Sequence, residues 1–140
     1  MATYTTYTDN SVIASSSGGN YAGSPAQTML TGVFDASKRG LAAADVAEVV
    51  NIPAGTYVTK VFVEVLVVDD ATHVFNVGDG ADPDGYVAGA AADALATSMG
   101  AGALAGGKFY ASADTIDVEA AVGDPLDTLK VRISVACVIA

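Results

Sequence analysis

The chain has 140 residues, of which 51% are apolar and 16% charged, so it is long enough for one folded domain and too apolar to be disordered. Its 16 acidic and 6 basic residues give a net charge of −10, which excludes direct binding to nucleic acid, because phosphate contacts need Lys and Arg. The single Cys137 excludes an internal disulfide, and no apolar stretch reaches the roughly 20 residues of a membrane span.

The N-terminal residues differ in composition from the rest of the chain. Residues 1–27 are rich in Thr, Ser, Gly and Tyr, and the run SSSGGN over residues 15–20 favours a loop. We therefore expect an extended N-terminal arm over residues 1–27 and a β-sandwich domain over residues 28–140. Tyr4, Tyr7 and Tyr21 suit an arm that becomes ordered on a partner, since tyrosine combines an apolar ring with a polar hydroxyl. A mobile tail is the alternative.

From residue 28 onward apolar residues recur at every second position, which predicts β-strands with one face on a core. The longest run covers residues 57–68. Its expected core face carries Tyr57, Thr59, Val61, Val63, Val65 and Val67. Its other face is half polar and is expected to meet solvent or another subunit; it carries Val58, Lys60, Phe62, Glu64, Leu66 and Val68.

Shorter runs predict further strands at residues 28–34, 45–52, 72–77, 86–88, 108–111, 116–122 and 129–139. About seven or eight strands without amphipathic helices between them are typical of an all-β fold, here a jelly-roll-like antiparallel β-sandwich. Residues 89–99 are the exception. There Leu95 and Met99 are four positions apart and Gly100 follows, so we expect one short helix in a loop.

Candidate catalytic groups are few. The only histidine, His73, lies in a short alternating run, which favours a strand residue at a sheet edge or interface over a catalytic base or metal ligand. Asp117 and Glu119 alternate on one strand and are expected to be solvated, with nothing to mark either as an acid of raised pKa. We therefore predict that the protein is not an enzyme, with no catalytic residues and no cofactor.

The loop VGDGADPDG at residues 77–85 places Asp79, Asp82 and Asp84 close together in the sequence. Turn formation explains these residues, since Asp accepts local hydrogen bonds, Gly adopts positive φ and Pro fixes φ. The other interpretation is a weak cation site built from the three carboxylates. The loop does not match the calcium loop of EF-hands, because Pro83 interrupts the spacing and no Glu stands at the twelfth position. We expect a turn and predict no metal ligand, and the cation interpretation stays open.

Residues 49–89, with the sequence VVNIPAGTYVTKVFVEVLVVDDATHVFNVGDGADPDGYVAG, resemble a segment of small virion proteins of tailed bacteriophages and prophages. In those proteins a Pro-Gly turn leads into a long alternating strand, and a hairpin with the pattern VGDG-x-DPDG-(F/Y) follows. Because each piece alone is also ordinary turn chemistry, the resemblance depends on their combination.

The resemblance implies a bacteriophage virion structural protein with a jelly-roll fold, a capsid decoration (cement) protein that binds the outer surface of the phage head and stabilises the shell. It also implies a homotrimer, whose partners are its own copies and the major capsid protein. With the composition above, we expect neither nucleic acid nor membrane as a partner. The alternative is a host-surface carbohydrate-binding module, or a head-fibre or tail appendage, because related jelly-rolls occur in those roles.

Overall fold

The computed structural model describes residues 15–16, 19–20, 26–69, 72–98, 100, 102–121 and 125–139. None of these residues is helical, so the described part of the chain contains no helix long and apolar enough to cross a bilayer. The strands are β1 (Ser15–Ser16), β2 (Gly19–Asn20), β3 (Ala26–Asp35), β4 (Val46–Ile52), β5 (Thr56–Val67), β6 (Val74–Gly78), β7 (Val87–Ala91), β8 (Thr97–Ser98), β9 (Lys108–Tyr110), β10 (Asp114–Ala120) and β11 (Lys130–Ile139). The predicted arm, residues 1–27, falls mostly outside the described residues and stays a prediction.

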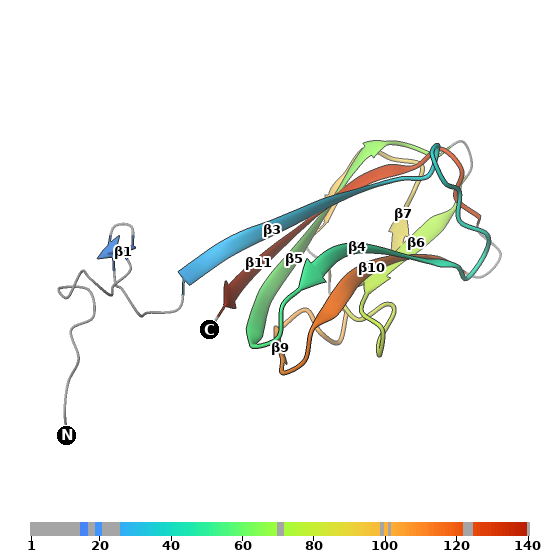
Figure 1. Ribbon diagram of the computed structural model, residues 1–140. Coiled ribbons are helices and arrows are strands. Elements are labelled where there is room, and N and C mark those ends of the chain that lie inside the picture. Colours follow the sequence, from blue (N-terminus) through green and yellow to red (C-terminus); the bar gives the residue numbers. More distant parts are fainter. Residues whose placement is uncertain are drawn as a thin grey trace, which may run out of the picture.

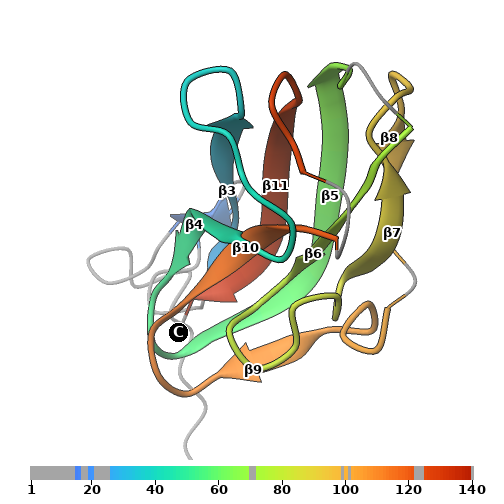
Figure 2. The same ribbon diagram turned by 90° about the vertical axis from the view of Figure 1, so that its right-hand side faces the viewer.

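Strands β3 to β11 form two antiparallel sheets that face each other (Figure 1). One is a five-stranded sheet in the order β3-β11-β5-β8, with β9 pairing the other end of β5, and the second is a four-stranded sheet in the order β4-β10-β6-β7. Figure 2 shows the long strands β3, β11 and β5 side by side behind β4, β10 and β6. Successive strands alternate between the sheets except at the β6–β7 hairpin and at the short strands β8 and β9, which together line one edge of β5. This connectivity is a jelly-roll, as predicted.

The sandwich closes where β3 approaches β4. A Cβ atom added at Gly32 would lie 2.3 Å from the carbonyl oxygen of Val49, so only glycine allows the two backbones to come this close. The core between the sheets is built from alternate strand residues. The largest fully buried side chains are Tyr86, Phe75, Ile52, Ile116, Leu126, Leu129 and Ile133.

The predicted faces of the long strand are partly wrong, because two β-bulges interrupt the pairing of β5 with β11. Ala136 pairs with Lys60 whereas Cys137 pairs with Val58, so Thr59 is the extra residue at the first bulge. The hydroxyl of Thr59 donates to the carbonyl oxygen of Ala136 at 2.9 Å. At the second bulge, Leu66 is the extra residue, since Lys130 and Val131 pair with Val67 and Val65. Beyond each extra residue the alternation is shifted by one position, so the side chains that would face the core face outward and the reverse.

Between the bulges the prediction is confirmed, since Val61, Val63 and Val65 are buried. Before the first bulge the inward residues are Thr56 and Val58, both fully buried. Tyr57 is 42% exposed and Val67 is 48% exposed. Both are expected on the core face, and neither belongs to the core.

The helix expected at residues 89–99 is absent from the described residues. The first part of this segment belongs to β7, where Ala90 and Ala91 pair with β6, and Thr97 in β8 pairs with Glu64 of β5. Met99 lies outside the described residues, and Leu95 is 71% exposed, so Leu95 does not pack against the core as a helix would require. Pairing with two neighbouring strands satisfies the backbone here, which overrides the local helical preference of alanine.

Candidate functional site

The outer face of the four-stranded sheet is acidic. Its strands contain Glu48, Asp114, Asp117 and Glu119 and no Lys or Arg. Asp117 of β10 pairs directly with Glu48 of β4 across the sheet, because a bulge between Ile116 and Asp117 skips Val49. Two like charges opposite each other destabilise a sheet, so this pairing needs a compensating feature.

Asp117 is buried although its side chain belongs to the outer face. It pairs with Gly78 of β6, and a Cβ atom at Gly78 would lie 2.0 Å from the carbonyl oxygen of Asp82. The loop after β6 therefore folds back over the sheet at this glycine and covers Asp117, which is only 5% exposed. The expectation that Asp117 is solvated is wrong. It rests on alternation along the strand, which contains no information about the loop that folds over Asp117.

The same burial determines the charge of Asp117. Burial is the main cause that raises the pKa of Asp117 to about 6; the nearby carboxylates of Glu48, Asp114 and Asp79 act in the same direction, against a hydrogen bond that lowers it. That bond comes from the hydroxyl of Thr115, which donates to Asp117 Oδ1 at 2.6 Å. Asp117 is thus an acid of raised pKa, contrary to the expectation that no carboxylate here is one.

Asp79 forms the centre of a hydrogen-bonded network at the base of the β6–β7 loop. Its Oδ1 accepts the backbone N–H groups of Ala81 and Asp82 at 3.0 and 2.9 Å. Its Oδ2 accepts from Lys108 Nζ at 2.6 Å and from the Tyr110 hydroxyl at 2.8 Å. Burial raises the pKa of Asp79, but the hydrogen bonds from Lys108 and Tyr110 outweigh burial and lower it.

Two buried tyrosines extend this network. The hydroxyl groups of Tyr86 and Tyr110 lie 2.7 Å apart, and the ammonium of Lys108 lies 4.7 Å from the centre of the Tyr110 ring. Burial raises the pKa of Tyr86 to about 12, so its phenol is neutral. The network ties the β6–β7 loop to β9 on the other sheet, which gives it a structural role.

The three loop aspartates do not act together. Asp79 is buried and paired, whereas Asp84 is exposed and Asp82 is partly exposed. A hydrogen bond with Asp84 raises the pKa of Asp82, so these two carboxyl groups interact with each other and not with Asp79 as a set of three. No group of three His, Cys, Asp or Glu that could hold a metal ion occurs among the described residues. The turn interpretation therefore accounts for the loop residues.

His73 immediately precedes β6, at the end of the sandwich that holds the loop of residues 127–129. Its Nδ1 lies 3.8 Å from Oδ1 of the buried Asp69. The other oxygen of Asp69 accepts the backbone N–H groups of Asp127, Thr128 and Leu129 at 3.0, 3.2 and 3.3 Å. This arrangement holds the start of β11 in place.

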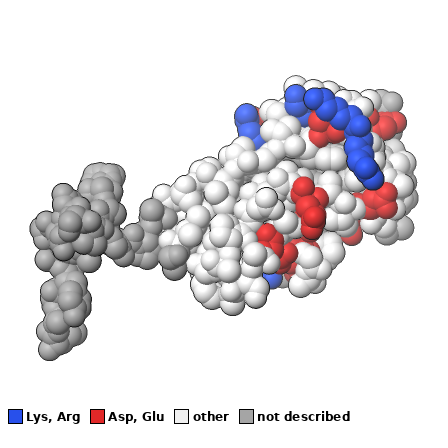
Figure 3. Space-filling model, viewed as in Figure 1, with Lys and Arg blue, Asp and Glu red and all other residues white. Residues whose placement is uncertain are grey.

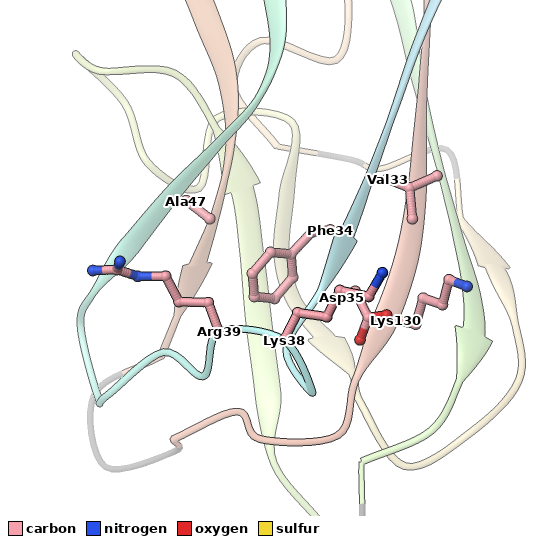
Figure 4. A pocket seen from close by; sticks show the side chains of 7 residues that line it. All are labelled: Val33, Phe34, Asp35, Lys38, Arg39, Ala47 and Lys130. Atoms are coloured by element: carbon pink, nitrogen blue, oxygen red, sulfur yellow. The ribbon is translucent and has the colours of Figure 1, made fainter.

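A basic pocket lies at the end of the sandwich where β3 leads into β4. The pocket has a volume of about 500 Å³ and is lined by Val33, Phe34, Asp35, Lys38, Arg39, Ala47 and Lys130. Figure 4 shows the Phe34 ring between Arg39 on one side and Lys130 on the other. Most of the basic atoms visible in Figure 3 gather at this end, with acidic atoms along the face below.

The single carboxylate of the pocket is already engaged. Asp35 Oδ1 accepts from the backbone N–H and the hydroxyl of Ser37 at 3.0 and 2.6 Å. The hydrogen bond from the Ser37 hydroxyl lowers the pKa of Asp35, and the charges of Lys130 and Lys38 lower it further. This pocket is not among the sites predicted from the sequence. The signal was the adjacent pair Lys38-Arg39, the only such basic pair in an acidic chain.

The outer face of the five-stranded sheet exposes several large apolar side chains. Tyr57 pairs with Val138 of β11 and with Phe109 of β9, so the three form one row across the strands. Phe109 is 55% exposed, and Met29 on β3 is 52% exposed. Between the bulges this is the face of Lys60 and Phe62, which is predicted to meet solvent or a subunit. Tyr57 is predicted for the core and reaches this face through the bulge at Thr59.

No family model and no curated protein sequence matches the chain. Among solved structures, a chain in the capsid of Ralstonia phage GP4 matches with a TM-score of 0.66 and 15% identity, over 84% of this chain and 86% of that one. A chain in the acid-stable capsid of Helicobacter pylori bacteriophage KHP30 matches with a TM-score of 0.58 and 18% identity, over 83% and 90%. A chain in the capsid of cyanophage Pam1 matches with a TM-score of 0.58 and 18% identity, over 86% and 89%.

These similarities extend over most of each compared chain, so the whole sandwich is shared. At 15–18% identity they establish the fold. The chain therefore has the jelly-roll fold of chains found in phage capsid structures, and the resemblance predicted from residues 49–89 is confirmed at that level.

Proposed function

We propose that the protein is a bacteriophage virion structural protein that decorates the capsid, binding the outer surface of the head and stabilising the shell. The observation that carries this proposal is the fold shared with chains of three phage capsid structures over more than four-fifths of this chain. The resemblance of residues 49–89 to small virion proteins points the same way. The proposed partners are the major capsid protein and two further copies of the chain.

The chemistry of the described residues supports a structural role without catalysis. Asp117 is buried beneath the β6–β7 loop, and the buried Asp79 at the base of that loop is engaged by Lys108 and Tyr110. Because both oxygens of Asp79 already accept hydrogen bonds, the loop of residues 77–89 has fewer free carboxylates for a sugar or a cation than the carbohydrate-binding alternative requires. The decoration proposal is therefore the better supported of the two.

A decoration protein stabilises a shell by mass action, because it binds the assembled lattice and not the free subunits. Exposed apolar side chains on the five-stranded sheet, such as Tyr57 and Phe109, supply contact area of the kind that interfaces use. We expect phage heads that lack the protein to bind it when it is added, and to withstand a higher temperature afterwards.

The test measures cosedimentation of the purified protein with such heads and the temperature at which the heads release their DNA. The doubly substituted chain Tyr57→Ser/Phe109→Ser should bind less, and Val46→Ser, which removes an exposed apolar side chain from β4 of the other sheet, serves as the control for general surface effects. If the wild-type protein stays in the supernatant, or is found on the tail of intact virions, the decoration proposal is wrong.

The N-terminal arm of residues 1–27 is proposed as a clasp on the shell. Several weak arms on one oligomer act as one tight attachment when they can engage together. Deleting residues 1–20 should leave a sandwich with an unchanged unfolding transition that no longer cosediments with heads. Full binding by the shortened chain would contradict the clasp.

A further inference from the structure

The two sheets divide the charges of the protein unequally. The strands of the four-stranded sheet carry four acidic residues and no basic residue. The strands of the five-stranded sheet carry Lys60, Lys108, Lys130 and Arg132 against Asp35 and Glu64. The loop between β3 and β4 adds Lys38 and Arg39. An acidic chain thus keeps most of its basic residues on one side.

Two of the six basic residues are neutralised within the molecule. Lys108 pairs with Asp79, and Arg132 pairs with Glu64. Three of the others, Lys38, Arg39 and Lys130, border the basic pocket and have no ion-pair partner within 4 Å among the described residues (Figure 4). Because Asp35 is the only carboxylate in the pocket, the pocket has an excess of two positive charges above an apolar floor of Phe34, Val33 and Ala47.

The same molecule carries a hollow of opposite charge. It is lined by Glu48, Asn51, Ala113, Asp114 and Thr115 on the outer face of β4 and β10. Glu48 is exposed and faces Asp117, so a cation placed there relieves repulsion between two carboxylates. The exposed side chains of Lys38 and Arg39 stand on a loop and can supply that cation from another copy.

We propose that the pocket of Lys38, Arg39 and Lys130 in one copy binds the Glu48–Asp114 hollow of a second copy of this chain. The charges identify the occupant, since the complementary surface is present on every copy. The contact joins two different patches and is therefore head-to-tail, the type that closes a ring when the rotation allows it. It deepens the proposed function, because it supplies an interface for the homotrimer.

The net charge of −10 does not prevent such a contact. At physiological salt the screening length is about 8 Å, so distant charges are screened while charges in contact are not. Complementary pairs across an interface then determine both register and partner. Raising the salt concentration should weaken the contact.

The experiment measures the mass of the full chain in solution by analytical ultracentrifugation over a range of concentrations and salt. Arg39→Glu makes the basic pocket less positive, and Glu48→Lys reverses one charge of the hollow; both positions are exposed, so the fold should survive. Each single variant should weaken association by about tenfold or more, as close charge pairs at interfaces do. Lys60→Glu has the same charge change as Arg39→Glu but lies outside the pocket, and should associate like the wild type.

Rescue distinguishes this contact from a general effect of charge. The double variant Arg39→Glu/Glu48→Lys exchanges the two signs, so it should associate again. An equal mixture of the two single variants should associate more than either alone, because each offers the surface that the other needs, although a ring of three keeps one contact between identical variants. A wild-type chain that stays monomeric, or an oligomer that Arg39→Glu and Glu48→Lys leave unchanged, would overturn the inference.

Cosedimentation with phage heads, measured on the same samples, separates this inference from the proposed function. A monomeric wild-type chain that binds heads refutes the contact between copies and leaves decoration standing. An oligomer with charge rescue that ignores heads supports the contact and refutes decoration.

Discussion

Asp79 and Asp117 lie in neighbouring regions of the sandwich and are both buried, yet their surroundings drive their pKa values in opposite directions. Asp79, in the loop after β6, receives an ammonium, a phenol and two backbone N–H groups. Asp117, in the β4–β10 pair, receives one hydroxyl and faces other carboxylates. Burial penalises a charge in both places, so the difference arises from the partners. One carboxylate stabilises the fold while charged, and the other destabilises it.

The largest effect is expected from Asp79→Ala. The substitution leaves the Lys108 ammonium, the Tyr110 hydroxyl and two loop N–H groups without their acceptor, and should lower the free energy of unfolding by about 3–5 kcal/mol. Urea denaturation at pH 7 measures it. Asp84→Asn, an exposed change in the same loop, is the control and should alter stability by less than about 0.5 kcal/mol. Equal effects of the two would show that the network contributes nothing.

Gly78→Ala tests whether the loop covers Asp117. The new methyl group would meet the carbonyl oxygen of Asp82, and relieving that overlap should cost about 3 kcal/mol. Displacing the loop also exposes Asp117, so its pKa should fall towards an ordinary value in an NMR titration of the carboxyl groups. Gly106→Ala is the matched control, since a Cβ atom there meets nothing within 4 Å. An unchanged Asp117 titration in Gly78→Ala would contradict the covering role.

The raised pKa of Asp117 predicts a dependence of stability on pH. Between its ordinary value of 3.8 and about 6, the folded state holds a proton that the unfolded state has lost. The contribution of Asp117 to stability is therefore fully present below pH 3.8 and is lost as the pH rises from there through about 6. Asp117→Asn keeps the bond from Thr115, removes the charge, and should stabilise the protein at pH 7 by roughly 2 kcal/mol.

Denaturation curves of wild type and Asp117→Asn at pH 4 and pH 7 provide the measurement. The two proteins should be similar at pH 4 and differ at pH 7. Glu119→Gln, the next outward carboxylate on β10, should follow the wild type at both values, because Glu119 is less buried and accepts from Asn76. A constant difference between wild type and Asp117→Asn across this range would refute the assignment.

The smallest effect is expected from Glu48→Gln. Removing this exposed charge relieves part of the repulsion at Asp117, so the pKa of Asp117 should fall slightly and stability at pH 7 should rise by less than about 1 kcal/mol. An NMR titration of Asp117 in the variant detects the change. A pKa of Asp117 that rises or stays constant would show that Glu48 contributes nothing to its shift.

The sequence by itself determined the fold class and the positions of the main strands. Alternation at residues 28–34, 45–52, 57–68 and 129–139 predicts β3, β4, β5 and β11 because a strand with one buried face needs an apolar residue at every second position. Asp, Gly and Pro at residues 77–85 form a turn as expected, because their conformational preferences are local. Both signals are local, so a single chain segment contains them.

Only the tertiary structure decided which side of β5 is buried at each end, because the bulges at Thr59 and Leu66 depend on the register with β11. The burial of Asp117 depends on a loop that crosses Gly78, and the basic pocket brings Lys38 and Arg39 beside Lys130, some 90 positions later in the chain. Residues 89–91 and 97–98 of the alanine-rich segment form strands because neighbouring strands satisfy their backbone. The proposed contacts therefore depend on charges and strand faces that long-range pairing brings together. Alternation along one segment does not predict that pairing.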